Sequence, residues 1–160
     1  MPREKLVIRE SKPSDLDRIL EIERKSFRNP WSIGLFKFFS KRYPHGFLVA
    51  EVNGKVVGYV ITALETKLDF KRLSIVKHGH ILNLAVDEGY RKRGVASALL
   101  RHILRSLQES EASKVYLEVR VSNLAAIKLY SKFNFKVEKV LRTYYPDEED
   151  AYLMSKTLSN

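Results

Sequence analysis

The chain has 160 residues and no cysteine, which excludes a disulfide framework and a thiolate metal site. Lys and Arg number 29 against 19 Asp and Glu, and this net charge of +10 favours anionic partners without choosing among cofactor phosphates, RNA and acidic peptides. No apolar run reaches membrane-spanning length and no signal-peptide pattern opens the chain, so we expect one cytoplasmic domain over residues 1–160 with no membrane partner.

The first third of the sequence predicts a strand followed by two helices. Lys5–Glu10 is typical of a strand, and Ser11–Phe27 combines a Pro-Ser-Asp start with apolar residues at helical spacing. A second helix is expected over Asn29–Lys41, where Pro30 suits the first turn.

A hairpin is predicted next. The apolar runs of Phe47–Glu65 are separated by Asn53-Gly54, the strongest short-range turn dipeptide. The basic segment Thr66–Lys77 has no regular pattern, so we expect a long loop there, of the kind that is often functional.

The middle of the chain alternates between strand and helix patterns. His80–Val86 is an apolar run typical of a strand buried on both faces. From Gly94 to Leu107 the apolar residues recur at helical spacing, Lys114–Val121 predicts a strand, and Leu124–Phe133 predicts a helix.

Two closing strands are predicted over Phe135–Tyr145 and Asp150–Leu158, around a turn at Pro146–Asp150. These patterns together indicate an α/β protein with a mixed, mostly antiparallel sheet that helices cover on both sides. A nucleic-acid module would show aromatic residues among basic ones on a sheet face, or a recognition helix. Neither pattern is found, so we expect no DNA partner.

The stretch "YRKRGVASALL" places a glycine and small residues where a strand passes into a helix. The first N–H groups of a helix lack intrahelical partners, and Gly94 leaves the backbone accessible, so the pattern favours a phosphate or pyrophosphate site with Arg91, Lys92 and Arg93 as mobile charges at its rim. The alternative is an ordinary helix that needs one glycine in its entry turn. Neither a dinucleotide fingerprint nor a nucleotide P-loop is present.

Arg91-x-x-Gly94-x-Ala96 between "ILNLAV" and an amphipathic helix resembles the acetyl-CoA signature of the GNAT N-acetyltransferases, as does "LEVRVSNLAAIKLYSKFNF" downstream. The resemblance covers nearly the whole chain and implies the GNAT fold, a twisted sheet of about seven strands with about four helices. Within the family, "FRNPWS" and "YYPDEEDAYLM" are similar to the archaeal N-terminal acetyltransferases and the bacterial ribosomal-protein alanine acetyltransferase. The resemblance implies acetyl-CoA as donor, CoA as product, and a cofactor site at Leu84, Ala85, Val86, Lys92, Arg93, Gly94, Val95, Ala96, Ser97, Asn123 and Tyr130.

Glu118 stands inside "VYLEVRV", a strand that otherwise reads as core, where an unpaired carboxylate is costly. The functional interpretation is a general base for the attacking amine, which the family motif supports; the alternative is an ion pair with a neighbour such as Arg120. Tyr130 is the candidate general acid for the leaving thiolate, against the alternative of a core aromatic. Asn123 can cap the following helix or, as the resemblance implies, hold the pantetheine arm with its amide, and one residue can do both.

His80 has three interpretations: a second base, a partner of Glu118 in a metal site, or a surface histidine at a strand end, which is the commonest outcome. No His/Cys/Asp cluster has metal-ligand spacing, so we expect no metal. The resemblance places the acceptor peptide among Phe27, Trp31, Leu84, Tyr144 and Tyr145. Arg28 is a departure, because a subgroup of relatives carries a Glu there and its acceptor preference cannot be transferred.

We therefore expect transfer of acetyl to the α-amino group of protein N-termini, by direct attack in a ternary complex because no cysteine is present for an acyl-enzyme. Ribosomal proteins and the ribosome are candidate partners, and the enzyme is expected to be a monomer or weak dimer. One alternative is a GNAT enzyme acting on a small amine or a lysine side chain. Another is a non-catalytic basic module that binds RNA or ribosomes.

Overall fold

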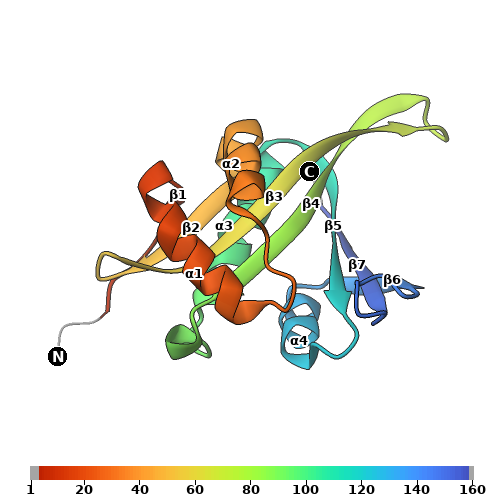
Figure 1. The fold of residues 1–160 in the computed structure, drawn as a ribbon. Coiled ribbons are helices and arrows are strands. Elements are labelled where there is room, and N and C mark those ends of the chain that lie inside the picture. The colour runs from red at the N-terminus through yellow and green to blue at the C-terminus, as the bar shows by residue number, and fades with distance from the viewer. Residues whose placement is uncertain (1–3, 159–160) are drawn as a thin grey trace. The chain divides into compact units, whose positions relative to one another are not determined.

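The computed structural model describes residues 4–158 and contains a seven-stranded sheet of order β1-β2-β3-β4-β5-β7-β6 (Figure 1). The pairs β1–β2, β2–β3, β5–β7 and β6–β7 are antiparallel and β4–β5 is parallel, which confirms the predicted mixed, mostly antiparallel sheet. The strands are β1 (Leu6–Glu10), β2 (Phe47–Val52), β3 (Lys55–Asp69), β4 (Ser74–Val86), β5 (Ala112–Arg120), β6 (Lys136–Leu141) and β7 (Ala151–Thr157). The helices are α1 (Leu16–Ser26), α2 (Ile33–Arg42), α3 (Val95–Glu109) and α4 (Leu124–Lys132), with 3-10 turns at Pro13–Asp15, Pro44–Gly46 and Glu88–Tyr90.

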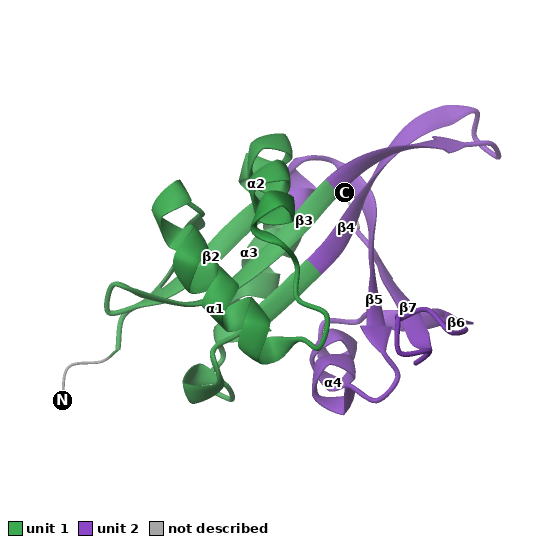
Figure 2. Cartoon of the chain, in the orientation of Figure 1, with its two compact units in different colours: residues 1–63, 83–106 green, residues 64–82, 107–160 purple. Residues whose placement is uncertain are grey.

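The chain divides into two compact units (Figure 2). The first comprises the described residues up to Ala63 together with Asn83–Ser106, and the second comprises Leu64–Leu82 together with the described residues from Leu107 onward. Strands β3 and β4 pass from one unit into the other, and the expectation of a single domain stays a prediction. Among residues 4–158, no helix is both long enough and apolar enough to cross a membrane.

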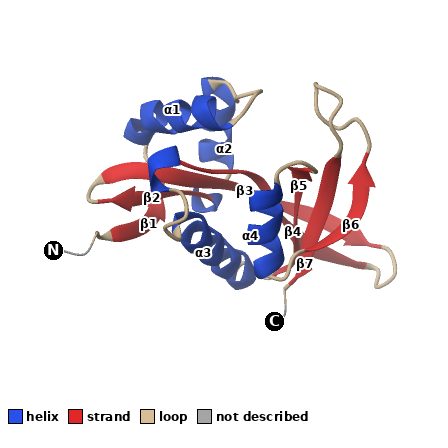
Figure 3. Ribbon diagram, turned by 90° about the horizontal axis from the view of Figure 1, so that it is seen from below, coloured by secondary structure: helices blue, strands red, loops and turns tan. Residues whose placement is uncertain are grey.

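In the first unit, α1 and α2 lie on one face of the strands and α3 lies on the opposite face (Figure 3). The helices are amphipathic, and their apolar stripes form the core: Ile19 and Ile22 of α1, Phe36 of α2 and Leu99 of α3 are each at most 1% exposed. Each such side chain contributes roughly 1.5–3 kcal/mol by leaving water. The predicted turn is confirmed, since Asn53 and Gly54 have φ of 50° and 82° between β2 and β3.

The predicted long loop at Thr66–Lys77 is wrong. Strand β3 continues to Asp69 and β4 already begins at Ser74, so only a short turn separates them. The side chains of this extension remain in solvent, among them Leu68, Phe70 and Leu73 at 56%, 77% and 84% exposure. When both faces of a two-stranded extension lie in solvent, its sequence shows no alternation of apolar and polar residues. The strands still pair through backbone hydrogen bonds.

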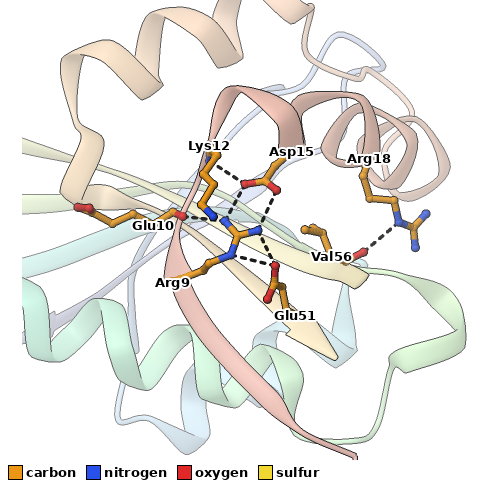
Figure 4. Close-up of polar contacts among 7 residues, drawn as sticks. All are labelled: Arg9, Glu10, Lys12, Asp15, Arg18, Glu51 and Val56. Carbon is orange, nitrogen blue, oxygen red and sulfur yellow. Dashed lines mark hydrogen bonds and ion pairs between the residues drawn. The ribbon is translucent and has the colours of Figure 1, made fainter. Parts of the chain in front are cut away.

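An ion-pair cluster ties β1 to β2 and to the turn before α1 (Figure 4). Arg9 donates to both carboxylate oxygens of Asp15 at 2.8 and 2.9 Å and to Glu51 at 2.6 Å. Asp15 is only 7% exposed and also accepts the N–H of Lys12 at 2.7 Å. Burial alone raises the pKa of Asp15, but the hydrogen bonds from Arg9 and Lys12 bring it below its ordinary value.

In the second unit, β5 has two distinct faces. Val115, Leu117 and Val119 are buried, whereas Tyr116, Glu118 and Arg120 project from the other face and are half-buried. Strand β5 pairs with β4 from Lys77↔Ala112 to His80↔Tyr116 and with β7 along its length. This register brings His80 beside the polar face of β5.

Candidate active site

The turn that follows β4 in the first unit is anchored at its first residue. Asp87 donates its N–H to the carbonyl of Val57 at 2.7 Å, and its side chain accepts the N–H of Gly89 at 3.0 Å and pairs with Arg18. Burial raises the pKa of Asp87, but the bonds from Gly89 and Arg18 lower it overall. The turn is therefore held against β3 and α1.

The end of this turn fits an anion. Gly94 is exposed with φ of 82°, a left-handed conformation that costs other residues strain, and a Cβ there would meet no atom within 4 Å. Helix α3 begins at Val95, and its first hydrogen bond joins the N–H of Ala98 to the carbonyl of Gly94 at 3.0 Å. The preceding N–H groups lack intrahelical partners and lie at the positive end of the helix dipole. Pyrophosphate oxygens are suitable partners for them.

The basic residues of the turn are less free than expected. Arg91 donates to the carbonyl of Val86 at 3.0 Å and to Ser26 Oγ at 3.4 Å, so its description as a mobile rim charge is wrong. Arg93 is paired with Glu4 at 3.3 Å. These bonds tie Arg91 to the end of β4 and Arg93 to Glu4, while residues 91–94 themselves are exposed.

The predicted cofactor residues divide between the two units. The first unit holds Leu84, Ala85, Val86, Lys92, Arg93, Gly94, Val95, Ala96 and Ser97. The second holds Asn123 and Tyr130. Their roles toward acetyl-CoA stay predictions.

Glu118 in the second unit is paired with His80. Its carboxylate lies 2.7 Å from Nε2 of His80, and each side chain is 17% exposed. The alternative pairing with Arg120 is wrong, since Arg120 bonds Asp147 and Glu149 instead. The expectation of a surface histidine at a strand end is also wrong, because His80 lies inside β4 against β5.

Two residues beside this pair were missed at the sequence level. Tyr116 stacks on the His80 ring with centroids 4.2 Å apart and donates to Glu65 at 2.6 Å. Glu65 also lies 3.3 Å from His80 Nδ1 and 3.1 Å from Lys67. Burial raises the pKa of Tyr116; it raises that of Glu65 too, but the Tyr116 and Lys67 bonds bring Glu65 below its ordinary value. Tyr116 could have been found from its i, i+2 spacing to Glu118, since this spacing places both side chains on one face of the strand.

These side chains form a linear chain: Tyr116 joins Glu65, Glu65 joins His80, and His80 joins Glu118. A histidine between two carboxylates is held in one ring orientation and offers a path for a proton. Across residues 4–158, no group of three or more His, Cys, Asp or Glu side chains is arranged to hold a metal ion.

Tyr130 and Asn123 belong to α4. Tyr130 is 7% exposed, its ring lies 5.6 Å from that of Phe135, and burial raises the pKa of its hydroxyl. Asn123 Oδ1 accepts the N–H of Ala126 at 3.2 Å, which confirms the capping interpretation. Because burial raises its pKa, the hydroxyl of Tyr130 keeps its proton at neutral pH, as a general acid requires.

The candidate acceptor residues are divided between the two units. In the second unit, Arg120 lies 4.0 Å from the ring centroid of Tyr145 and bonds Asp147, and burial raises the pKa of Tyr145 to about 12. The neighbouring Tyr144 is 48% exposed. In the first unit, Phe27 is half-buried. The ring of Trp31 packs against the rings of Phe36 and Phe39 of α2, with centroids 5.5 and 5.3 Å away.

The fold and this set of residues define an acetyltransferase of the GNAT type. A family model described as the Acetyltransferase (GNAT) family matches residues 16–135, and the chain belongs to this family. An N-alpha-acetyltransferase of Sulfurisphaera tokodaii is 44% identical over 94% of this chain and 92% of its own. The [Ribosomal protein bS18]-alanine N-acetyltransferase of Escherichia coli K12 is 31% identical over 91% of this chain and 93% of its own.

Solved structures agree with this assignment. The structure of Ard1 from Thermoplasma volcanium is 32% identical, covers 97% of this chain and 99% of its own, and has a TM-score of 0.86. Arabidopsis thaliana NAA60 in complex with acetyl-CoA is 25% identical over 96% and 100% of the two chains, with a TM-score of 0.82. The chain is therefore an acetyltransferase, and acetyl-CoA is the acetyl donor of its family.

Proposed function

We propose that this enzyme transfers acetyl from acetyl-CoA to the α-amino group of protein N-termini by direct attack, without an acyl-enzyme. The observation that carries the proposal is the Glu118–His80 pair, a carboxylate and an imidazole 2.7 Å apart on a half-buried strand face. The N-alpha-acetyltransferases that share 44% and 43% identity with the chain support the choice of acceptor.

Glu118 is the general base of this mechanism. An α-ammonium group has an ordinary pKa near 8, so it is mostly protonated at neutral pH and must lose a proton before it attacks. An ionised carboxylate accepts that proton directly or through water, and His80 keeps the carboxylate oriented and takes the proton onward. The reaction needs no metal in this scheme.

The first unit supplies the donor-binding groups. Bound acetyl-CoA supplies an activated thioester. The backbone N–H groups from Lys92 to Ser97 hold the pyrophosphate at the start of α3, and the strand end Leu84–Val86 pairs with the pantetheine arm. A backbone N–H near Leu84 or Val86 polarises the thioester carbonyl.

The second unit supplies the remaining chemistry. Tyr130, whose hydroxyl stays protonated, gives its proton to the leaving thiolate. Asn123 adds a side-chain amide for the pantetheine besides capping α4. Tyr144 and Tyr145 of this unit, and Phe27 and Trp31 of the first unit, are the proposed contacts to the acceptor backbone. Ribosomal proteins are among the proposed acceptors because the Escherichia coli relative is named for one.

One assay tests the proposal. The enzyme is incubated with acetyl-CoA and peptides that begin with Ser, Ala, Met-Leu and Met-Glu, and products are read by mass spectrometry. An N-blocked peptide containing lysine is the control. We expect acetylation of free α-amines only; acetylation of the blocked peptide alone overturns the proposed acceptor.

A further inference from the structure

Glu23 is a buried carboxylate that none of the proposed catalytic roles uses. It lies on the apolar face of α1, one turn after Ile19, and is 1% exposed. A carboxylate in such a place is costly unless its oxygens are fully hydrogen-bonded. The groups that satisfy it therefore indicate what the residue does.

Three donors converge on this carboxylate, all within the first unit. Oε1 accepts the backbone N–H of Trp31 at 3.0 Å, and Oε2 accepts Nδ2 of Asn83 at 2.8 Å and the hydroxyl of Tyr59. Three donors and no competing acceptor are the pattern that an ionised carboxylate satisfies. Burial raises the pKa of Glu23 above its ordinary value, and the three hydrogen bonds offset only part of that rise.

The same residue holds both ends of the loop Phe27–Trp31. Its backbone carbonyl accepts the N–H of Phe27 at 3.0 Å, and its side chain accepts the N–H of Trp31. Between these two anchors, residues 28–30 are exposed. Tyr59 and Asn83 connect the clamp to β3 and β4, so the loop is fixed to the sheet through one carboxylate.

We propose that Glu23 is a positioning residue, which clamps the loop Phe27–Trp31 in the conformation that receives the acceptor N-terminus. The proposal rests on the proposed function, because that loop carries two of the acceptor-contacting residues. The side chain acts through Trp31 and takes no part in proton transfer.

The test uses Glu23→Gln and Glu23→Met with a matched control. Gln keeps the shape, but its one oxygen cannot accept from both Trp31 and Asn83 in their present orientations; Met accepts from neither. The control is Asp15→Asn, which alters another buried carboxylate of the same unit, one whose hydrogen-bond partners are Arg9 and Lys12 (Figure 4). It reports what loss of stability alone does.

Steady-state kinetics give the first readout, with the panel peptide that the wild type acetylates best. We expect Glu23→Gln to raise the peptide KM about tenfold, as expected for one lost hydrogen bond to a charged group, while the KM for acetyl-CoA changes less than about twofold. Glu23→Met should raise it further, and Asp15→Asn should lower the Tm without moving either KM. An unchanged peptide KM in both Glu23 variants, or the same KM change in Asp15→Asn, overturns the proposal.

The second readout does not depend on activity. Trp31 is the only tryptophan of the sequence, so its fluorescence reports the loop directly. We expect greater acrylamide quenching in both Glu23 variants and wild-type quenching in Asp15→Asn; unchanged quenching in the Glu23 variants shows that Glu23 does not hold the loop. If the wild type acetylates no α-amine, the proposed function fails, and the quenching still decides whether the clamp exists.

Discussion

The carboxylate of Glu118 on β5 lies 2.7 Å from Nε2 of His80 on β4, and the parallel register that pairs His80 with Tyr116 brings them together. The two residues are 38 positions apart in the chain. The proposed base and its proposed orienting partner thus come from two neighbouring strands.

Glu118→Gln removes the proposed base while preserving its shape. We expect kcat on peptide to fall by about 10²-fold or more, with acetyl-CoA affinity within about twofold of wild type. His80→Gln should cost about tenfold, and the double variant should cost little more than Glu118→Gln, because the two side chains act as one unit. Steady-state kinetics and calorimetric titration with acetyl-CoA check this, with the exposed Glu109→Gln as control. Full turnover by Glu118→Gln removes the base role.

Tyr130→Phe deletes a buried hydroxyl and keeps the ring that packs on Phe135. We expect kcat to fall by about 10²-fold, since the leaving thiolate loses its proton donor, and the Tm to change little. Tyr152→Phe on β7 is the matched control and should remain active. A Tyr130→Phe enzyme with wild-type kcat would show that Tyr130 is only a core aromatic.

Gly94→Ala forces a Cβ into a left-handed conformation with φ of 82°. The strain should destabilise the fold by about 1–2 kcal/mol and weaken acetyl-CoA binding, because the backbone N–H groups move. Gly34→Ala in α2, where the nearest atom to the added Cβ is Ser32 Oγ at 3.7 Å, should instead stabilise slightly. Thermal unfolding with and without acetyl-CoA tests this; equal effects in the two variants contradict the prediction.

Asp15→Asn should change the acid stability of the fold. The pKa of Asp15 is lower in the folded state than its ordinary value of 3.8, so the ionised carboxylate stabilises the protein above about pH 4 and this contribution is lost as the pH falls through the folded-state pKa. The Tm difference between wild type and variant should therefore be largest near neutral pH and shrink below pH 4. A difference that grows on acidification has the wrong sign.

Local features of this chain follow from residues close together in sequence. Asn53-Gly54 forms the expected turn because both residues tolerate positive φ, and Asn123 caps α4 because its amide reaches a nearby N–H. The apolar spacing of α3 and the glycine before it also suffice to predict a helix with an accessible start. The candidate site residues could be identified for the same reason, because they stand in short segments with recognisable local patterns.

The partners of those residues were not predictable. His80 meets Glu118 and Glu65, Arg120 meets Asp147, and Glu23 meets Asn83 60 positions away. The extended β3–β4 ribbon was also missed, because exposed strands carry no apolar alternation. Turns, helix caps and helical periodicity depend on neighbours within a few residues, so they can be predicted from the amino-acid sequence. Strand register and the burial of individual carboxylates depend on how distant segments pack, so they become visible only in the folded structure.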